Sequence, residues 1–408
     1  MTWQRISLGN VSKVFSGYAF KAKDLTKDKD GISIIKIANI QDKKVLDTCQ
    51  TYLPKNLYNE KLKKYYLREE DFLIAMTGAG SVGKVGKMVN PKGKFLVNQR
   101  VGIVRVNSRL ADPRFVYYLL SQDAFENYMY GLGLGAGQPN ISPSNISNIE
   151  INAPDLQTQR KIASILSAYD DLIENNTRRI KILEEMAQSI YKEWFVNFRF
   201  PGHEKVKFVD SELGKIPEGW KIHKFNDVID MNPRESIDKT RLKKFVGMEK
   251  LNTSNMIIDG YNLKLGNSGS KFRNYDVLFA RITPSLENGK TGFVQFLENS
   301  EIGFGSTELI VFRSKLVNPE YVYFLSRDNE FRQNAINSMV GASGRQRVQN
   351  DSLKNYEVVK PSKEYLDMFA DLVTPKFRSI QYLHLKNNNL RKTRDLLLPK
   401  LMSGEVEV

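Results

Sequence analysis

Residues 155–197 carry hydrophobic side chains in two parallel rows. Within each row the positions are seven residues apart, and the second row starts four residues after the first. The first row holds Ile162, Tyr169, Asn176, Leu183 and Ile190, and the second holds Leu166, Ile173, Ile180, Ala187 and Trp194. Hydrophobic spacing that averages about 3.5 residues predicts a long helix with a coiled-coil seam. Asp155 can cap the start of this helix, and Asn176 would fix the register of a partner helix.

The C-terminal segment repeats this stripe at an offset of 207 residues. Its members are Ile380, Leu383, Leu390, Leu397 and Leu401, which match Ile173, Asn176, Leu183, Ile190 and Trp194. Each stripe alone is also consistent with a helix that packs on the core of its own domain. Two matching stripes favour pairing of the two helices, antiparallel if the chain folds back through the segment between them. Pro375 interrupts the second pattern, and we expect it to kink or delay that helix.

The repeat extends to the rest of the chain. FLIAMTGAGSVGKVG at 72–86 is echoed by VLFARITPSLENGKTG at 277–292, and each segment follows an aspartate, Asp71 or Asp276. DPRFVYYLLSQDAF at 112–125 returns as NPEYVYFLSRDNEF at 318–331. A tryptophan, Trp3 or Trp220, opens each copy. The chain is therefore two copies of one unit, each ending in a long helix.

Within a copy, residues 32–40 and 95–106 alternate as strands do, while residues 112–130 have helical spacing. Ser142 followed by Pro143 predicts the start of a short helix. We therefore expect an α+β fold of two tandem mixed domains, residues 1–154 and 220–361. Each is followed by a long helix, residues 155–197 and, with a tail, residues 362–408. The glycines, prolines and charges of residues 198–219 indicate an exposed linker without regular structure.

The charge balance suggests a class of ligand. The chain has 61 Lys and Arg against 46 Asp and Glu, a net charge of +15. Such a surplus favours a polyanion, nucleic acid first and a membrane surface second, although a basic protein kept soluble by its charge has the same balance. No apolar run approaches the ~18 residues of a membrane span. Cys49 is the single cysteine, which excludes disulfides and thiolate zinc sites within one chain. These features predict a soluble, cytoplasmic protein without a metal site.

Several enzyme motifs are absent from the sequence. The three histidines, His203, His223 and His384, are far apart, so helical His pairs and clustered histidine nuclease motifs are missing. No two prolines are adjacent, which removes the Pro-Pro loop of amino-methyltransferases, and no Glu-x-Lys half of a nuclease metal site occurs. GAGSVG at 78–83 fits a nucleotide-binding fingerprint, but the following residue Lys84 precedes Val85 and a turn-like segment rather than a helix. A basic Gly-Lys hairpin that contacts a DNA backbone suits both copies better.

The loop GLGLGAGQPN at 131–140 and its counterpart GASGRQRV at 341–348 combine glycine with side chains that can bond base edges. Gln and Asn can bind adenine bidentately, Arg can bind guanine, and glycine lets the backbone approach closely. The candidate DNA-binding residues are Lys84, Lys87, Gln99, Arg100, Gln138, Asn140, Arg281, Lys290, Arg345, Gln346 and Arg347. Two simpler roles remain open: Asn140 and Asn145 as helix caps, and Gln99-Arg100, aligned near Ser306-Thr307, as a solvated strand edge.

Three segments carry a resemblance to a known family. GQPNIS at 137–142 with the spaced isoleucines that follow to Leu166, LGKIPEGW at 213–220, and RKTRDLLLPKLMSGEVEV at 391–408 resemble the specificity (S) subunits of type I restriction–modification enzymes. The resemblance covers the whole chain and implies two target recognition domains, each reading half of a split double-stranded DNA sequence. It also implies that the two helices set the gap between the halves and bind two methyltransferase (modification) subunits.

The resemblance implies that the chain itself is not catalytic and binds no cofactor. Partner subunits would carry out methyl transfer with S-adenosylmethionine, and restriction subunits would carry out translocation and cleavage with ATP and Mg. Two alternatives remain: a stand-alone sequence-specific DNA-binding protein, and a methyltransferase or nuclease with built-in recognition. An acidic mimic of DNA is excluded by the net charge of +15.

Overall fold

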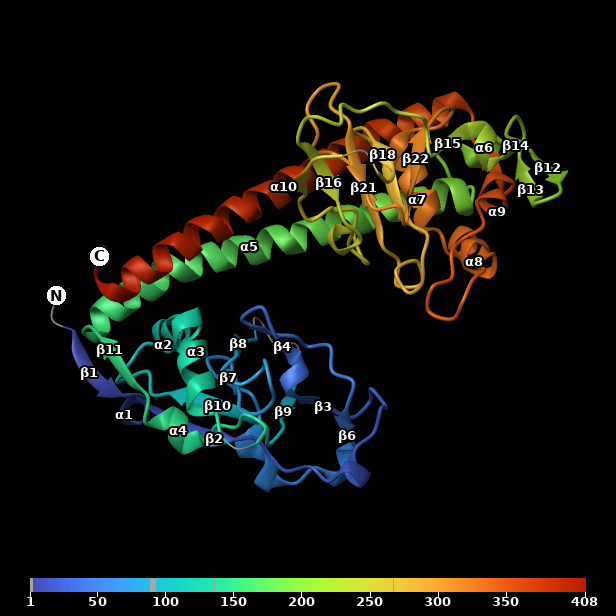
Figure 1. Ribbon diagram of the computed structural model, residues 1–408. Coiled ribbons are helices and arrows are strands. Elements are labelled where there is room, and N and C mark those ends of the chain that lie inside the picture. Colours follow the sequence, from blue (N-terminus) through green and yellow to red (C-terminus); the bar gives the residue numbers. More distant parts are fainter. Residues whose placement is uncertain (1–2, 89–92, 136, 267) are drawn as a thin grey trace. The chain divides into compact units, whose positions relative to one another are not determined.

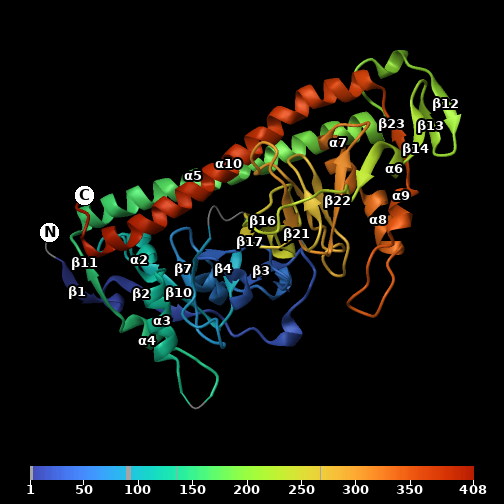
Figure 2. The ribbon, with the colours of Figure 1, turned by 45° about the horizontal axis from the view of Figure 1, so that its top comes forward.

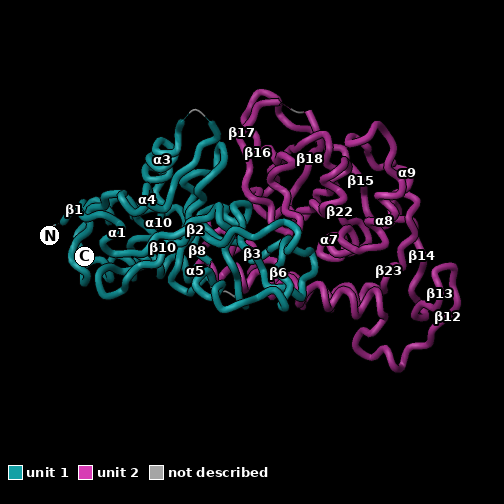
Figure 3. The backbone as a smooth tube through the Cα atoms, turned by 90° about the horizontal axis from the view of Figure 1, so that it is seen from below, with its two compact units in different colours: residues 1–172, 390–408 teal, residues 173–389 magenta. Residues whose placement is uncertain are grey.

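The computed structural model describes residues 3–88, 93–135, 137–266 and 268–408. The chain divides into two compact units, coloured teal and magenta in Figure 3. Unit 1 comprises residues 1–172 and 390–408, and unit 2 comprises residues 173–389. Residues 89–92 of the turn-like segment and Ala136 of the glycine-rich loop lie outside the described residues.

Unit 1 contains a six-stranded sheet in the order β2-β10-β7-β8-β5-β4, a three-stranded sheet β6-β3-β9 and the pair β1-β11. Its strands are β1 (Gln4–Ser7), β2 (Ser12–Ser16), β3 (Ile32–Ile35), β4 (Ile40–Gln41), β5 (Lys44–Val45), β6 (Tyr52–Leu53), β7 (Phe72–Ala75), β8 (Val85–Lys87), β9 (Phe95–Val97), β10 (Val101–Val106) and β11 (Glu150–Ala153). Its shorter helices are α1 (Leu8–Val11), α2 (Pro113–Leu120), α3 (Asp123–Leu132) and α4 (Pro143–Ser147).

Unit 2 has a related arrangement with two four-stranded sheets, in the orders β15-β22-β19-β20 and β17-β16-β21-β18, and the pairs β12-β13 and β14-β23. Its strands are β12 (Phe208–Ser211), β13 (Gly214–Pro217), β14 (Lys221–Lys224), β15 (Ile229–Met231), β16 (Lys243–Val246), β17 (Asn262–Lys264), β18 (Lys271–Phe272), β19 (Val277–Ala280), β20 (Thr291–Phe293), β21 (Gly303–Gly305), β22 (Leu309–Ser314) and β23 (Glu357–Lys360). Its shorter helices are α6 (Phe225–Val228), α7 (Pro319–Arg327), α8 (Asn329–Asn337) and α9 (Asn350–Lys354).

The central strand of each unit is buried on both faces. In β7, Phe72 and Ile74 join a cluster with Phe115 of α2, whereas Leu73 and Ala75 join a second cluster. Alternate side chains of a strand point to opposite faces, so a strand between two layers is apolar throughout. The same holds for β19, whose four residues are all buried. This explains the repeated apolar run that follows Asp71 and Asp276.

Capping side chains begin the helices where the sequence predicts. Asp112 accepts hydrogen bonds from the backbone N–H of Arg114 and of Phe115, at 2.9 and 3.1 Å, and Pro113 occupies the first turn of α2. Ser142 and Asn145 form a reciprocal capping box at α4. Asp155 accepts from the N–H groups of Gln157 and Thr158 at the start of the long helix α5. Such caps satisfy backbone donors that have no partner within the helix.

The two long helices, α5 (Leu156–Tyr191) and α10 (Lys363–Ser403), pack against each other in opposite directions, as Figures 1 and 2 show. In unit 1, the amino group of Lys161 donates to the carbonyl of Val408, just beyond α10, and Asp170 pairs with Arg394. Residue numbers therefore rise along α5 in the direction in which they fall along α10. In unit 2, Asn176 contacts Asn387. The predicted antiparallel pairing is therefore confirmed.

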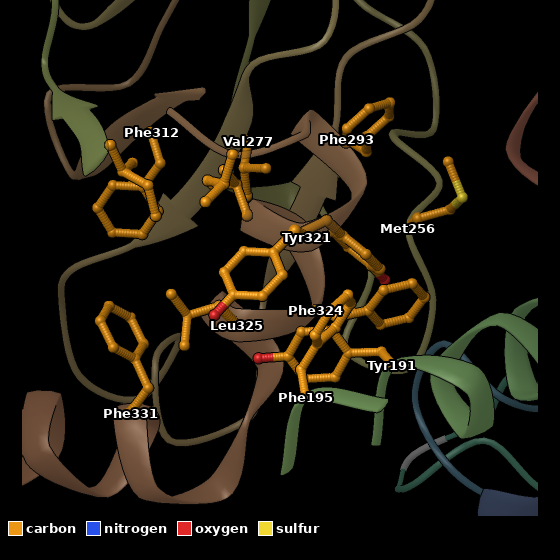
Figure 4. Close-up of a cluster of buried hydrophobic side chains, with 14 of the residues drawn as sticks. Tyr191, Phe195, Met256, Val277, Phe293, Phe312, Tyr321, Phe324, Leu325 and Phe331 are labelled. Carbon is orange, nitrogen blue, oxygen red and sulfur yellow. The ribbon is translucent and has the colours of Figure 1, made fainter. Parts of the chain in front are cut away.

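In unit 2 the helix pair is also part of the domain core. Tyr191 and Phe195 lie against Tyr321 and Phe324 of α7, with ring centroids of Tyr191 and Tyr321 5.4 Å apart and those of Phe195 and Tyr321 5.1 Å apart (Figure 4). Edge-on aromatic pairs of this kind add to the burial of apolar area. The end of α5 is thus fixed to the mixed domain that follows it.

The seam residues predicted from the sequence differ in burial. Those that are buried are Ile173, Asn176, Ile180, Trp194, Ile380, Leu383 and Leu401. Those that are half-buried are Leu183, Ile190, Leu390 and Leu397. Trp194 packs against Phe369 within the unit 2 core, so part of the stripe serves the domain as well as the helix pair.

Three expectations about secondary structure were wrong. Pro375 does not delay helix α10, which begins at Lys363 and continues through the proline; Val373 and Phe377 on either side are fully buried and offset the ~3 kcal/mol cost of an interior proline. Residues 198–219 contain the hairpin β12–β13, whose turn has Gly214 at φ 90°. Glycine suits such positive φ values, so here it marks a hairpin rather than a linker. The helical stretch at 112–130 is broken between α2 and α3.

Candidate nucleic-acid interface

Three loops of unit 1 converge at one end of its six-stranded sheet. Residues 76–84 follow β7, residues 98–100 join β9 to β10, and residues 133–141 lie between α3 and α4, in the long loop visible in Figure 2. The backbone N–H of Met76 donates to the carbonyl of Arg100 at 3.0 Å, and that of Ile141 donates to Met76 at 2.8 Å. Gly78 donates to the carbonyl of Pro139 at 3.1 Å. We call these three segments the unit 1 loop cluster.

The cluster brings four of the predicted DNA-binding residues together. Gln99, Arg100, Gln138 and Asn140 are all exposed, although they come from segments about 40 positions apart in the chain. Asn145, in contrast, is occupied as a cap, because its side-chain oxygen accepts from the N–H and hydroxyl of Ser142 at 2.8 and 2.6 Å. Of the two asparagines that the sequence could not tell apart, Asn145 is therefore a helix cap.

An aromatic side chain beside this cluster was not predicted from the sequence. The backbone N–H of Gln99 donates to the carbonyl of Tyr18 at 2.9 Å, and the Tyr18 ring is 37% exposed. Phe20 and Tyr65 support the ring edge-on, with centroids 5.0 and 5.3 Å away. An exposed, supported ring can contact a base or sugar face. Only the pairing of distant loops places Tyr18 here, so a sequence pattern gave no signal for it.

The two lysines predicted to contact DNA phosphates in unit 1 are less exposed than the loop residues. Lys84 is half-buried in the turn before β8. Lys87 lies within β8, where its amino group pairs with Glu70 at 2.9 Å and its side chain is only 18% exposed. The fingerprint GAGSVG forms a turn with positive φ at Gly78, Gly80 and Gly83 and leads into strand β8. It therefore lacks the helix N-terminus that a nucleotide phosphate needs.

Unit 2 builds the same arrangement from the equivalent loops. Arg281 N–H donates to the carbonyl of Glu308 at 3.0 Å, and Val348 N–H donates to Arg281 at 3.0 Å. Thr283 N–H donates to the carbonyl of Gln346 at 3.1 Å. We call residues 281–290, 306–308 and 338–348 the unit 2 loop cluster. The last of these segments joins α8 to α9 (Figure 1).

These matching hydrogen bonds align the two clusters residue by residue. Met76 corresponds to Arg281, Arg100 to Glu308, Gln138 to Arg345 and Asn140 to Arg347. The sequence placed Gln99-Arg100 near Ser306-Thr307, and the hydrogen bonds refine this alignment to Thr307-Glu308. Asn98 accepts from Arg100 N–H in unit 1, and Ser306 accepts from Glu308 N–H in unit 2, each at 3.2 Å.

The exposed chemistry of unit 2 differs from that of unit 1. Arg345 is exposed, Gln346 is half-buried, and Arg347 forms an ion pair with Glu308. Hydrogen bonds from Arg347 lower the pKa of Glu308 below its ordinary value. Arg281 is half-buried beside Val348, and the amino group of Lys290 donates to the carbonyl of Met248 at 2.9 Å. Lys290 is thus held by its own domain.

Clusters that could hold a metal ion and helices that could cross a membrane are both absent from the described part of the chain. Within residues 3–88, 93–135, 137–266 and 268–408, no group of three or more His, Cys, Asp or Glu side chains is placed to hold a metal ion. In the same part of the chain, no helix is both long and apolar enough to cross a membrane. Burial raises the pKa of the Cys49 thiol to about 11, so the nucleophilic thiolate is disfavoured.

Comparison with known proteins identifies the repeat. The chain matches the type I restriction modification DNA specificity domain over residues 1–185 and 217–367. The MjaIX specificity subunit of Methanocaldococcus jannaschii is 27% identical over 355 residues, which cover 82% of this chain and 78% of that protein. The HindI specificity subunit of Haemophilus influenzae is 22% identical, with 99% of both chains covered. The crystal structure of an S subunit from M. genitalium has the same fold, with a TM-score of 0.60 at 16% identity over 98% of this chain and 96% of that chain. The chain therefore belongs to the family of type I restriction–modification DNA specificity domains, two of which it carries in tandem.

Proposed function

We propose that the two loop clusters each read one half of a two-part DNA target, unit 1 one half and unit 2 the other. One observation carries this assignment: the same hydrogen-bonded scaffold recurs in both units, but it presents different side chains. Unit 1 offers Gln138 and Asn140, whose amides suit adenine, where unit 2 offers Arg345 and Arg347, whose guanidinium groups suit guanine. A constant scaffold with exchanged side chains is what independent half-site recognition needs.

The net charge of +15 supports binding to duplex DNA. Each phosphate neutralised by Lys or Arg releases counterions, so affinity should fall steeply with salt. Because Lys87 and Lys290 are engaged within the protein, exposed cations such as Arg100 and Arg345 are the better candidates for first contact. Their contribution is tested by the slope of log affinity against log salt.

Exposed apolar side chains on the long helices support docking of partner subunits. In unit 1, Leu172 and Leu396 are 46% and 61% exposed. In unit 2, Ile182, Met186 and Leu385 are 48–51% exposed. Ile182 and Met186 are one turn apart on α5, and neighbouring exposed apolar residues are typical of interaction surfaces. We assign these helix faces to the binding of methyltransferase (modification) subunits, two per chain in keeping with the repeat. The restriction subunits would then bind to the complex that forms.

In this proposal the chain itself is not catalytic. Methyl transfer with S-adenosylmethionine and DNA cleavage with ATP and Mg belong to the partner subunits. The turn formed by GAGSVG, which leads into a strand, supports the view that this chain does not supply a nucleotide site. This function requires a soluble protein in the cytoplasm, where the DNA that it binds is found.

Mapping of methylated adenines tests the proposal. The host genome would be compared with and without this gene, and the account expects loss of one two-part methylated sequence. A continuous sequence, or no change, would contradict it. The isolated full chain, incubated with labelled S-adenosylmethionine and duplex DNA, should transfer no methyl group. Transfer by the chain alone would favour the methyltransferase with built-in recognition.

A further inference from the structure

Glu308 holds Arg347 in a two-point ion pair within the unit 2 loop cluster. Nη2 of Arg347 lies 2.7 Å from Oε1 of Glu308, and Nε lies 2.9 Å from Oε2. The side chains are 46% and 24% exposed, so the pair lies at the surface of the cluster. Charge-assisted bonds at two points fix the plane of the guanidinium group as well as its position.

The backbone of Arg347 is held as firmly as its side chain. Arg347 and Val340 exchange two backbone hydrogen bonds, at 2.9 and 3.0 Å, and Arg347 also bridges to Ile282. The backbone of Glu308 is tied to the same loops through the N–H of Arg281. Both members of the pair therefore have fixed main chains on one scaffold.

The pair leaves one edge of the guanidinium group unused. A guanidinium carries five N–H donors in a fixed fork, and Glu308 takes the edge formed by Nε and Nη2. Nη1 and the outer hydrogen of Nη2 form a second edge that takes no part in this pair. That edge is a bidentate donor of the kind that binds O6 and N7 of guanine.

The equivalent positions of unit 1 contain no such pair. Arg100 stands where unit 2 has Glu308, and Asn140 stands where unit 2 has Arg347. Both Arg100 and Asn140 are exposed. A carboxylate on a surface that meets phosphates is unfavourable for binding, so its presence only in unit 2 calls for a function there.

We infer that Glu308 is a positioning residue that presents Arg347 to a guanine in the half-site read by unit 2. This inference rests on the proposed function of the loop clusters and names the base and the residue that orients its reader. Glu308 itself need not touch DNA. Its charge lowers the affinity for any duplex, and the fixed orientation of Arg347 provides discrimination in return.

The test uses the full-length chain, expressed with the modification subunits of its host, and a randomised duplex DNA library from which bound sequences are read. The variants are Glu308→Gln, Arg347→Ala and the double variant. Glu301→Gln is the matched control, since Glu301 also forms an ion pair in unit 2, with Lys244 at 2.8 Å, but lies outside the loop cluster. The half-site read by unit 1 reports in every sample that the complex is folded.

Arg347→Ala should abolish the preference for guanine at one position. Glu308→Gln should reduce the same preference by roughly fivefold to a hundredfold, the range for one bidentate base contact, while every other position is unchanged. The double variant should be no worse than Arg347→Ala, because Glu308 acts only through Arg347. Glu308→Gln should also bind non-target duplex more tightly, because a negative charge is removed from a surface that meets phosphates. A merely structural role would not confine the change in selection to the one position read by Arg347.

Unchanged selection by Glu308→Gln would overturn the inference, as would effects of the two single variants at different positions. If Glu308→Gln does not assemble, Glu308→Asp replaces it, and retention of the carboxylate should then preserve part of the preference. A wild-type complex that selects no two-part sequence would refute the proposed function itself. If the wild-type complex selects a two-part sequence and the Glu308→Gln complex selects the same sequence equally well, only the role of Glu308 is refuted.

Discussion

Asn176 on α5 and Asn387 on α10 are hydrogen-bonded to each other, with 2.9 Å between Nδ2 of Asn176 and Oδ1 of Asn387. Both side chains are buried, at 4% and 2% exposure. Asn387 also donates to the carbonyl of Ile173 and to the hydroxyl of Thr177, at 3.3 and 3.2 Å. A buried polar pair in an apolar seam is satisfied in one register only, so it selects one alignment of the two helices.

Replacing one member of this pair should destabilise the protein. Asn176→Ala leaves the oxygen of Asn387 without its partner in a buried site, which costs about 1–3 kcal/mol of unfolding free energy. Replacing both with Leu should be nearly neutral, because no buried polar group then remains. Urea unfolding measures both effects. Asn389→Ala, at an exposed position of α10, is the control and should change stability by less than about 0.5 kcal/mol. Equal losses in all three variants would show that the pair has no special role.

A second buried polar group should make stability depend on pH. Glu184 on α5 accepts a hydrogen bond from the Tyr323 hydroxyl, and its other oxygen accepts from Met256 N–H at 3.1 Å. Burial raises the pKa of Glu184 above its ordinary value of 4.5. The folded carboxyl thus binds its proton more tightly than the unfolded one, so this group's contribution to stability falls as pH rises above about 4.5.

Glu184→Gln should remove this contribution. The unfolding free energy of the variant minus that of the wild type should increase as the pH rises above about 4.5, because only the wild type must bury a charge. Urea unfolding at several pH values gives the difference. Glu185→Gln, next to it on α5 and 60% exposed, is the control against which that increase is measured. A difference for Glu184→Gln no steeper than that of the control would mean that its carboxyl titrates normally.

The repeated aspartates at the start of β7 and β19 should be important for stability. Asp71 is 2% exposed and pairs with Arg105 at 2.6 Å, and Asp276 pairs with Arg313 at 2.7 Å in the same way. Removing one partner of a buried pair leaves an uncompensated charge, so Asp71→Ala should cost about 3–5 kcal/mol. Asp123→Ala breaks a pair whose aspartate is 85% exposed and should cost at most about 1 kcal/mol. Similar losses in the two variants would contradict this assignment.

Local patterns predicted much of this fold because they depend on residues close in sequence. The caps at Asp112, Ser142 and Asp155, the long helices and the repeat all follow from spacing and residue type. Asn387 was not identified, because an offset of 207 residues pairs Asn176 with Leu383. That offset relates equivalent positions of a repeat, whereas antiparallel helices bring together positions whose numbers change in opposite directions.

The candidate site was predictable in its loops but not in its pairings. The glycine-rich segments indicated where backbone could approach DNA, and four exposed unit 1 residues meet there. Nothing in the sequence shows that Lys87 and Lys290 are held by Glu70 and by the carbonyl of Met248, since these partners come from other elements. Glu308 was missed for a further reason: an acidic residue is not expected on a surface that binds a polyanion.

The amide side chains of the unit 1 loop cluster should determine one half-site. Asn140→Ala or Gln138→Ala should relax selection at one base pair each, at about 1–3 kcal/mol per lost bidentate contact, and leave the other half-site unchanged. Asn145→Ala is the matched control: because Asn145 serves the capping box of α4, its loss should lower stability by about 1 kcal/mol without altering selection. Relaxed selection in Asn145→Ala would mean that the whole loop, rather than particular side chains, sets the sequence.

The length of helix α5, which lies between the two mixed domains in sequence, should set the gap between the two half-sites without changing either half-site. Seven residues inserted between positions 170 and 190 would lengthen α5 by about 10 Å, or about three base pairs of DNA. A full heptad keeps the apolar seam in phase, which an insertion of three or four residues would not. The gap should change, or binding should be lost if α10 cannot match the longer helix. Unchanged methylation at the original site would show that the helices do not set the gap.

Exchange of one mixed domain shows whether the two units read their half-sites independently. Residues 1–154 would be replaced by the same region of a relative that methylates a known two-part sequence, and methylated adenines would be mapped across the host genome. We expect one half of the methylated sequence to become that of the relative, while the other half and the gap stay as in the wild type. Simultaneous change of both halves, in a chimera that still methylates DNA, would contradict independent reading by the two units.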